Sequence, residues 1–98
     1  FYAALAILVP TPIVELNRAV AVGMADGADA GLAIVDAIRD EPSLKTYHLL
    51  PTVRGDLLEK LGRFEEARAE FLRAAVLTRN ARERALMLRR AGVPPLTI

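Results

Sequence analysis

Apolar residues recur at helical spacing along nearly the whole chain, and turn-forming residues interrupt the pattern at intervals. Six helices are expected, at residues 1–9, 12–25, 28–39, within 44–61, and at 64–77 and 81–90. No stretch shows the strict alternation of apolar and polar residues that is typical of a strand. The expected fold class is therefore all-α.

Prolines, glycines and one asparagine mark where these helices begin and end. Pro10 ends the first helix, Thr11 offers a cap and Pro12 occupies the first helical position, where a missing N–H costs nothing. Pro51 lies inside a helical pattern, so we expect either a kink or a helix that starts near Leu49 with Pro51 in its first turn. Other boundary signals are the Asp26–Gly27 turn, Pro42, Gly62, Asn80 with Glu83 as a loose capping box, and Gly92.

Composition bounds the domain and its chemistry. The 98 residues are enough for one small domain, and much of the 53% hydrophobic content is alanine. Cysteine is absent, which excludes disulfides, thiolate metal sites and a thiol nucleophile. The net charge of +1 does not indicate a protein that binds nucleic acid. Charge is uneven, however: residues 1–62 carry −3 and residues 63–98 carry +4, which predicts a basic face near the C-terminus.

The first nine residues are wholly apolar. Nine residues are half the length that a membrane span needs, and no positive flank marks a signal peptide. We expect them to be the end of a buried helix that begins earlier in a longer chain. If this helix were exposed, it would favour a homodimer. No membrane association is expected, and the predicted location is cytoplasmic.

The second half of the chain repeats the first. A shift of 37 residues places Ala30 on Ala67, Ile34 on Phe71 and Ala37 on Ala74. A period of this size, built from two short helices, indicates a helical solenoid. Alanine at 67 and 74 would let two helices approach closely, and Phe71 would fill the gap between units.

These positions resemble a tetratricopeptide repeat. The second unit carries the signature at Gly55, Gly62, Phe64, Ala67, Phe71 and Ala74, and the first carries it at Ala30, Ala37 and Pro42. The first unit departs from it with Arg18 in the place of Gly55, and the second departs with Pro51 and Arg79. The resemblance implies a single domain over 1–98: a right-handed stack of helix hairpins with repeats at 11–42 and 48–79 and a capping helix at 80–91.

A second resemblance is narrower. It rests on an ordered series of short strings: Pro10 to Val22, Asp26–Gly27, Gly31–Leu32, Tyr47 to Leu50, Arg54, Asp56 to Leu58, Leu61 to Arg63, and Glu66–Ala67. Together these resemble the C-terminal tetratricopeptide-like extension of bacterial extracytoplasmic-function sigma factors. The resemblance implies a parent protein that directs RNA polymerase to promoters. Its implied partners are the rest of the sigma factor, the polymerase or a regulator, with no direct DNA contact by residues 1–98.

Five residues are candidates for partner binding. Asn17 and Arg18 interrupt an apolar helix, and they are either a partner contact or a buried polar pair. Asp56 and Glu59, with Lys60 and Glu15, would line the groove formed by the first helix of each unit. Arg54 belongs to the strings that carry the sigma-factor resemblance.

Catalytic chemistry is not indicated, so no enzyme, cofactor or metal site is predicted. His48 is the single histidine, and no Ser/His/Asp arrangement is evident. The arginines near the C-terminus are interpreted as a solvated face or a domain contact. Two alternatives stay open for the function: a general tetratricopeptide-like peptide-binding scaffold, and a helical accessory domain of an enzyme.

Overall fold

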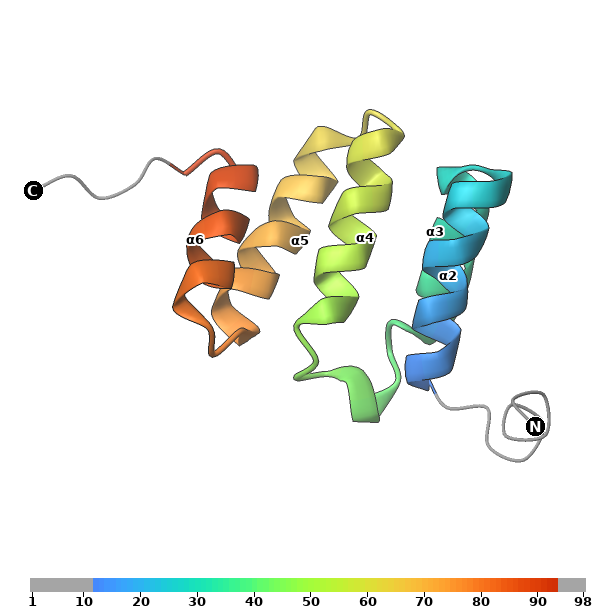
Figure 1. Cartoon of the computed structure of the whole chain (residues 1–98), viewed down its shortest axis with the longest axis horizontal. Helices are drawn as coiled ribbons and strands as arrows, with labels where there is room; N and C mark the ends of the chain where they lie inside the picture. The colour runs from blue at the N-terminus through green and yellow to red at the C-terminus, as the bar shows by residue number, and fades with distance from the viewer. Residues whose placement is uncertain (1–11, 94–98) are drawn as a thin grey trace, which may run out of the picture.

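The computed structural model describes residues 12–93, and these residues form an all-α fold (Figure 1). Its elements are α2 (Pro12–Asp26), α3 (Ala28–Ile38), the 3₁₀ helix η1 (Pro42–Leu44), α4 (Leu49–Lys60), α5 (Phe64–Leu77) and α6 (Ala81–Arg90). Residues 12–93 contain no strand, so the predicted fold class is confirmed at this level. The helix expected at residues 1–9 and the cap expected at Thr11 lie outside the described residues.

The helices form two hairpins and a final single helix. α2 packs against α3, and α4 packs against α5, while α3–α4 contacts join the two hairpins and α6 lies on α5 (Figure 1). Gly27 and Gly62 permit the tight turns within the hairpins, because both have a positive φ, of 107° and 77°, that other residues rarely adopt. Pro51 lies in the first turn of α4, as one of the two expected arrangements required.

The core follows the inner faces of both hairpins and continues under α6. Ala67 and Ala74 are 2% and 0% exposed, which confirms their predicted burial. Phe71 is also fully buried, and a Cβ built on Gly55 would lie 2.7 Å from its ring. Glycine at position 55 is therefore required for α4 and α5 to approach with this aromatic ring between them. Phe71 thus lies against Gly55 of its own hairpin and beneath the Arg90 guanidinium of α6.

The predicted register of the first hairpin is wrong by one residue. Ala37 is exposed and Ala30 is half-buried, whereas α3 buries Gly31, Leu32 and Val35. The first residues of α3 and α5, Ala28 and Phe64, are 36 residues apart, and so are the fully buried Val35 and Phe71.

The same shift of 36 pairs Ala19 with Gly55, so a fully buried small residue, and not Arg18, occupies the place of Gly55. In the first hairpin, Gly31 provides the close approach: a Cβ built there would lie 2.7 Å from the carbonyl oxygen of Ala19.

Two other signature residues, Phe64 and Pro42, lie at the surface. Phe64 is 66% exposed at the start of α5, so it adds little to the core. α3 ends at Ile38, one residue before the predicted end at Arg39, and Pro42 follows four residues after Ile38. Pro42 begins η1, and the first residue of a helix does not need its N–H for a helical hydrogen bond.

Candidate interaction groove

A hollow of about 330 Å³ is lined by residues of α2, α4 and α6. Its lining consists of Val20, Gly23, Met24, Thr52, Val53, Asp56, Leu57, Lys60 and Arg90. Met24 is 79% exposed, and Val20 beside it is also exposed. We call this hollow the interaction groove, because it combines exposed apolar side chains with a few charged groups, as binding sites commonly do.

An ion-pair cluster borders the groove on the α4–α6 side. One nitrogen of Arg90, Nη2, lies 3.0 Å from Asp56 Oδ1 and 3.0 Å from Glu59 Oε1. Lys60 Nζ lies 3.1 Å from the other oxygen of Asp56. The Arg90 guanidinium also lies over the Phe71 ring, 4.2 Å from its centroid, in cation–π geometry. The cluster thus attaches α6 to α4.

These contacts shift two pKa values. Partial burial would raise the pKa of the Asp56 carboxyl, but hydrogen bonds from Arg90 and Lys60 outweigh this effect, and the pKa lies below its ordinary value. For Arg90, partial burial would lower the pKa, but hydrogen bonds to Asp56 and Glu59 raise it above its ordinary value. Asp56 and Arg90 are therefore both charged at neutral pH.

Because the pKa of Asp56 is lowered in the folded protein, its contribution to stability depends on pH. Because its pKa is lowered on folding, the carboxylate stabilises the protein above its unfolded pKa of about 3.8, and this contribution disappears as pH falls through the lower folded pKa. At pH 7 we expect Asp56→Asn to lower the free energy of unfolding by about 0.5–1 kcal/mol, as is usual for partly exposed pairs. Urea denaturation of both proteins should show this difference shrinking below about pH 4. A difference that is constant across pH would contradict the assignment.

Arg54, a predicted binding residue, is buried and holds helices together. Its Nε lies 2.8 Å from Asp36 Oδ1 on α3, and its Nη1 lies 3.3 Å from Glu70 Oε1 on α5. The second oxygen of Glu70 is buried and has no hydrogen-bond partner among the described residues. Arg54 therefore neutralises the buried Glu70 carboxylate within its own hairpin and joins that hairpin to Asp36 on α3, so its side chain is not available to a partner.

Asn17 and Arg18 are both exposed on α2, so the interpretation as a buried polar pair is wrong. Arg18 Nη2 lies 2.9 Å from Glu15 Oε2, and hydrogen bonding to that carboxylate raises the pKa of Arg18. Neither residue lines the groove.

Of the five candidates, the structure places Asp56 in the groove lining and Glu59 on Arg90 next to it. Val20, Gly23, Met24 and Val53 were not among the predicted site residues, and Arg90 was predicted to belong to a solvated face or a domain contact. The rule that the first helix of each hairpin lines the groove would have found Val20 and Met24, which are four residues apart on the free side of α2.

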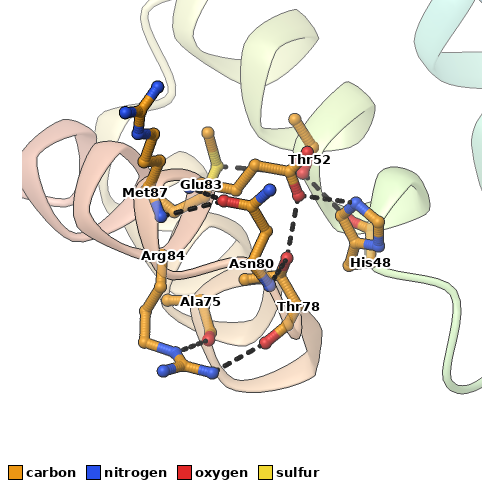
Figure 2. A network of polar contacts seen from close by, with 9 residues as sticks. His48, Thr52, Ala75, Thr78, Asn80, Glu83, Arg84 and Met87 are labelled. Atoms are coloured by element: carbon orange, nitrogen blue, oxygen red, sulfur yellow. Dashed lines mark hydrogen bonds and ion pairs between the residues drawn. The ribbon is translucent and has the colours of Figure 1, made fainter.

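A second polar network fixes the turn between α5 and α6 to the start of α4 (Figure 2). Glu83 Oε2 lies 3.0 Å from His48 Nε2 and accepts a hydrogen bond of 2.8 Å from the Thr78 hydroxyl. Asn80 caps α6 by accepting from the backbone N–H groups of Arg82 and Glu83, as predicted. His48 thus joins the start of α4 to α6 through Glu83.

Arg84 closes the other end of this network. Its guanidinium donates to the carbonyl oxygens of Ala75 and Thr78, at 3.2 and 2.8 Å, at the C-terminal end of α5 (Figure 2). Among residues 12–93 there is no group of three or more His, Asp or Glu side chains placed to bind a metal ion. No described helix is long and apolar enough to cross a membrane.

A protein of Rhizobium meliloti (strain 1021) that is described as uncharacterized is 42% identical to the chain over 100 residues. The similarity covers 99% of this chain but 23% of that relative, so the chain spans less than a quarter of the relative's length. No family model matches the chain, and no solved structure matches it.

Proposed function

We propose that this chain is a tetratricopeptide-like interaction domain of a bacterial sigma factor and regulates transcription initiation through protein contacts. The observation that carries the proposal is the pair of successive hairpins with equivalent buried positions 36 residues apart, Ala19 with Gly55 and Val35 with Phe71. The ordered strings that resemble the sigma-factor extension point to the parent protein. Nearly the whole chain also matches about a quarter of a longer relative, as a domain of a larger protein would.

The interaction groove is the proposed contact site. Met24 and Val20 offer apolar surface, and Asp56, Lys60 and Arg90 offer polar groups that would fix the orientation of a bound segment. A hollow of about 330 Å³ is large enough for only a few side chains, so the groove would bind a short segment. That segment would belong to the rest of the sigma factor, to RNA polymerase or to a regulator. The domain itself would be cytoplasmic and would perform no catalysis.

Transcription by the full-length gene product tests the proposal. The purified protein should bind core RNA polymerase and direct transcription from its own promoter. Met24→Glu places a charge in the groove, and we expect it to change transcript yield about tenfold, because one buried unpaired charge costs more than about 1.4 kcal/mol of binding. Val76→Glu is the matched control, since Val76 is 81% exposed on α5 and lies outside the groove.

Each outcome has a distinct meaning. A protein that does not bind core polymerase is not a sigma factor, and the general peptide-binding scaffold then becomes the better account if Met24→Glu still abolishes capture of a partner. A protein that binds polymerase but responds equally to Met24→Glu and Val76→Glu would show that the groove has no part in regulation.

A further inference from the structure

The outer face of α6 forms a stripe of exposed residues: Arg82, Ala85, Leu86 and Arg89. Their spacing of three, four and seven residues places them on one side of the helix. Leu86 at the centre is 45% exposed, while Met87 on the opposite side is buried in the core. α6 lies at one end of the row of helices with α5 on its inner side, so no described helix covers this stripe (Figure 1).

The two arginines of the stripe carry unneutralised charge. Neither the Arg82 nor the Arg89 side chain forms a hydrogen bond or ion pair with any residue in 12–93. Glu83, the single acidic residue of α6, faces His48 and Thr78 instead. The other arginines of α6 are engaged, with Arg84 on backbone carbonyls and Arg90 on carboxylates. The stripe is therefore a positive surface with an apolar centre.

We propose that this stripe binds an acidic amphipathic helix of a partner protein. Arg82 and Arg89 are about 10.5 Å apart along the axis of α6, at a rise of 1.5 Å per residue. A partner helix with carboxylates seven residues apart and an apolar residue between them has the same spacing. Its carboxylates would pair with the guanidinium groups, and its apolar residue would cover Leu86.

A nucleic acid is the other polyanion that such arginines attract, and the stripe suits it less well. A phosphate backbone would leave Leu86 and Ala85 without an apolar contact, and α6 has no aromatic side chain on which a base could stack. The stripe is also separate from the interaction groove, because none of its four residues lines that hollow. The inference therefore does not depend on the proposed function.

Fluorescence anisotropy with a designed probe tests the proposal on the 98-residue chain. The probe is a labelled alanine-based peptide of about 16 residues, long enough to form a helix, with two Glu seven residues apart and a Leu between them. We expect saturable binding at low salt that weakens as salt screens the charges. The same peptide with Lys in place of both Glu should not bind.

Charge reversal on the protein locates the site. The double variant Arg82→Glu with Arg89→Glu should weaken peptide binding about tenfold or more, because both attractive pairs become repulsive. The matched control is Arg39→Glu with Arg68→Glu, which changes net charge equally at two exposed arginines away from α6. We expect less than about a twofold effect from the control. Circular dichroism melts verify that both variants fold.

Four results would overturn the proposal. One is the absence of saturable peptide binding, and another is an equal loss in both double variants, which would indicate non-specific charge attraction. The third is tighter binding of a DNA duplex of similar length that is lost on reversing Arg82 and Arg89, which would make the stripe a nucleic-acid site. The fourth is a dimer in sedimentation experiments that the same reversal dissociates, since a second copy would then be the occupant.

Discussion

Replacing Phe71 by alanine is expected to lower the free energy of unfolding by about 3–5 kcal/mol. The ring is fully buried, lies against Gly55 of α4, and supports the guanidinium of Arg90 from α6. Its loss would leave a cavity where three helices meet, and it would also free Arg90 from its aromatic contact. Domains of this size have total stabilities of about 5–15 kcal/mol, so the variant would be close to unfolding. Urea denaturation followed by circular dichroism measures the effect.

Phe64→Ala is the control for this experiment. The same side chain is removed from the same helix, but Phe64 is 66% exposed, so we expect a change within about 0.5 kcal/mol. Similar losses in the two variants would mean that Phe71 is not the centre of the packing between α4, α5 and α6.

Arg54→Ala is expected to cost about 3 kcal/mol of unfolding free energy, because the buried carboxylate of Glu70 would keep only its longer contact, 3.8 Å, with the exposed Arg73 Nη1. Arg18→Ala is the matched control. Arg18 occupies the equivalent place on α2, 36 residues earlier, but its ion pair with Glu15 is exposed, and its loss should cost less than about 1 kcal/mol. Chemical denaturation of both variants makes the comparison.

A double variant separates charge from packing. Replacing Arg54 and Glu70 together by leucine removes both buried charges, and we expect it to recover most of the stability that Arg54→Ala loses. If Arg54→Ala were as stable as Arg18→Ala, then Arg54 would not be the link between α3, α4 and α5.

Helix boundaries were predictable because capping and helix-breaking residues act locally. Gly27 and Gly62 adopt a positive φ, Asn80 caps its own helix, and a proline in a first turn leaves no hydrogen bond unmade. Each of these signals depends on the chain within a few residues of it. The described helices therefore end within about one or two residues of the predicted positions, which is the ordinary uncertainty of helix ends.

The register of the first hairpin was not predictable in the same way. α3 carries alanine on several sides, at 30, 33 and 37, and apolar residues at both 34 and 35. Alanine gains little from burial and tolerates exposure, so it does not show which side faces the core. The decisive residue is Gly31, whose missing side chain lets α3 approach the backbone of α2, and that approach is visible only in three dimensions.

The burial of Arg54 and the ion pairs beside the groove could not be predicted from the sequence either. An arginine within a helix is usually exposed, and the carboxylates that allow Arg54 to be buried come from two other helices. Arg90 likewise finds Asp56 and Glu59 on α4, more than 30 residues earlier in the chain. Contacts between distant residues of this kind decide which charged groups are structural and which remain free for partners.

The central structural claim is that α2–α3 and α4–α5 are successive copies of one unit with a period of 36 residues. Nuclear Overhauser effects in the isotope-labelled chain test it most directly. The claim predicts cross-peaks between a Gly55 Hα and the Phe71 ring, and between the Hα protons of Gly31 and Gly23, which meet at the crossing of the first hairpin. Cross-peaks from the Ala37 methyl group to Leu16 and Ala19, in place of those from Gly31, would contradict it.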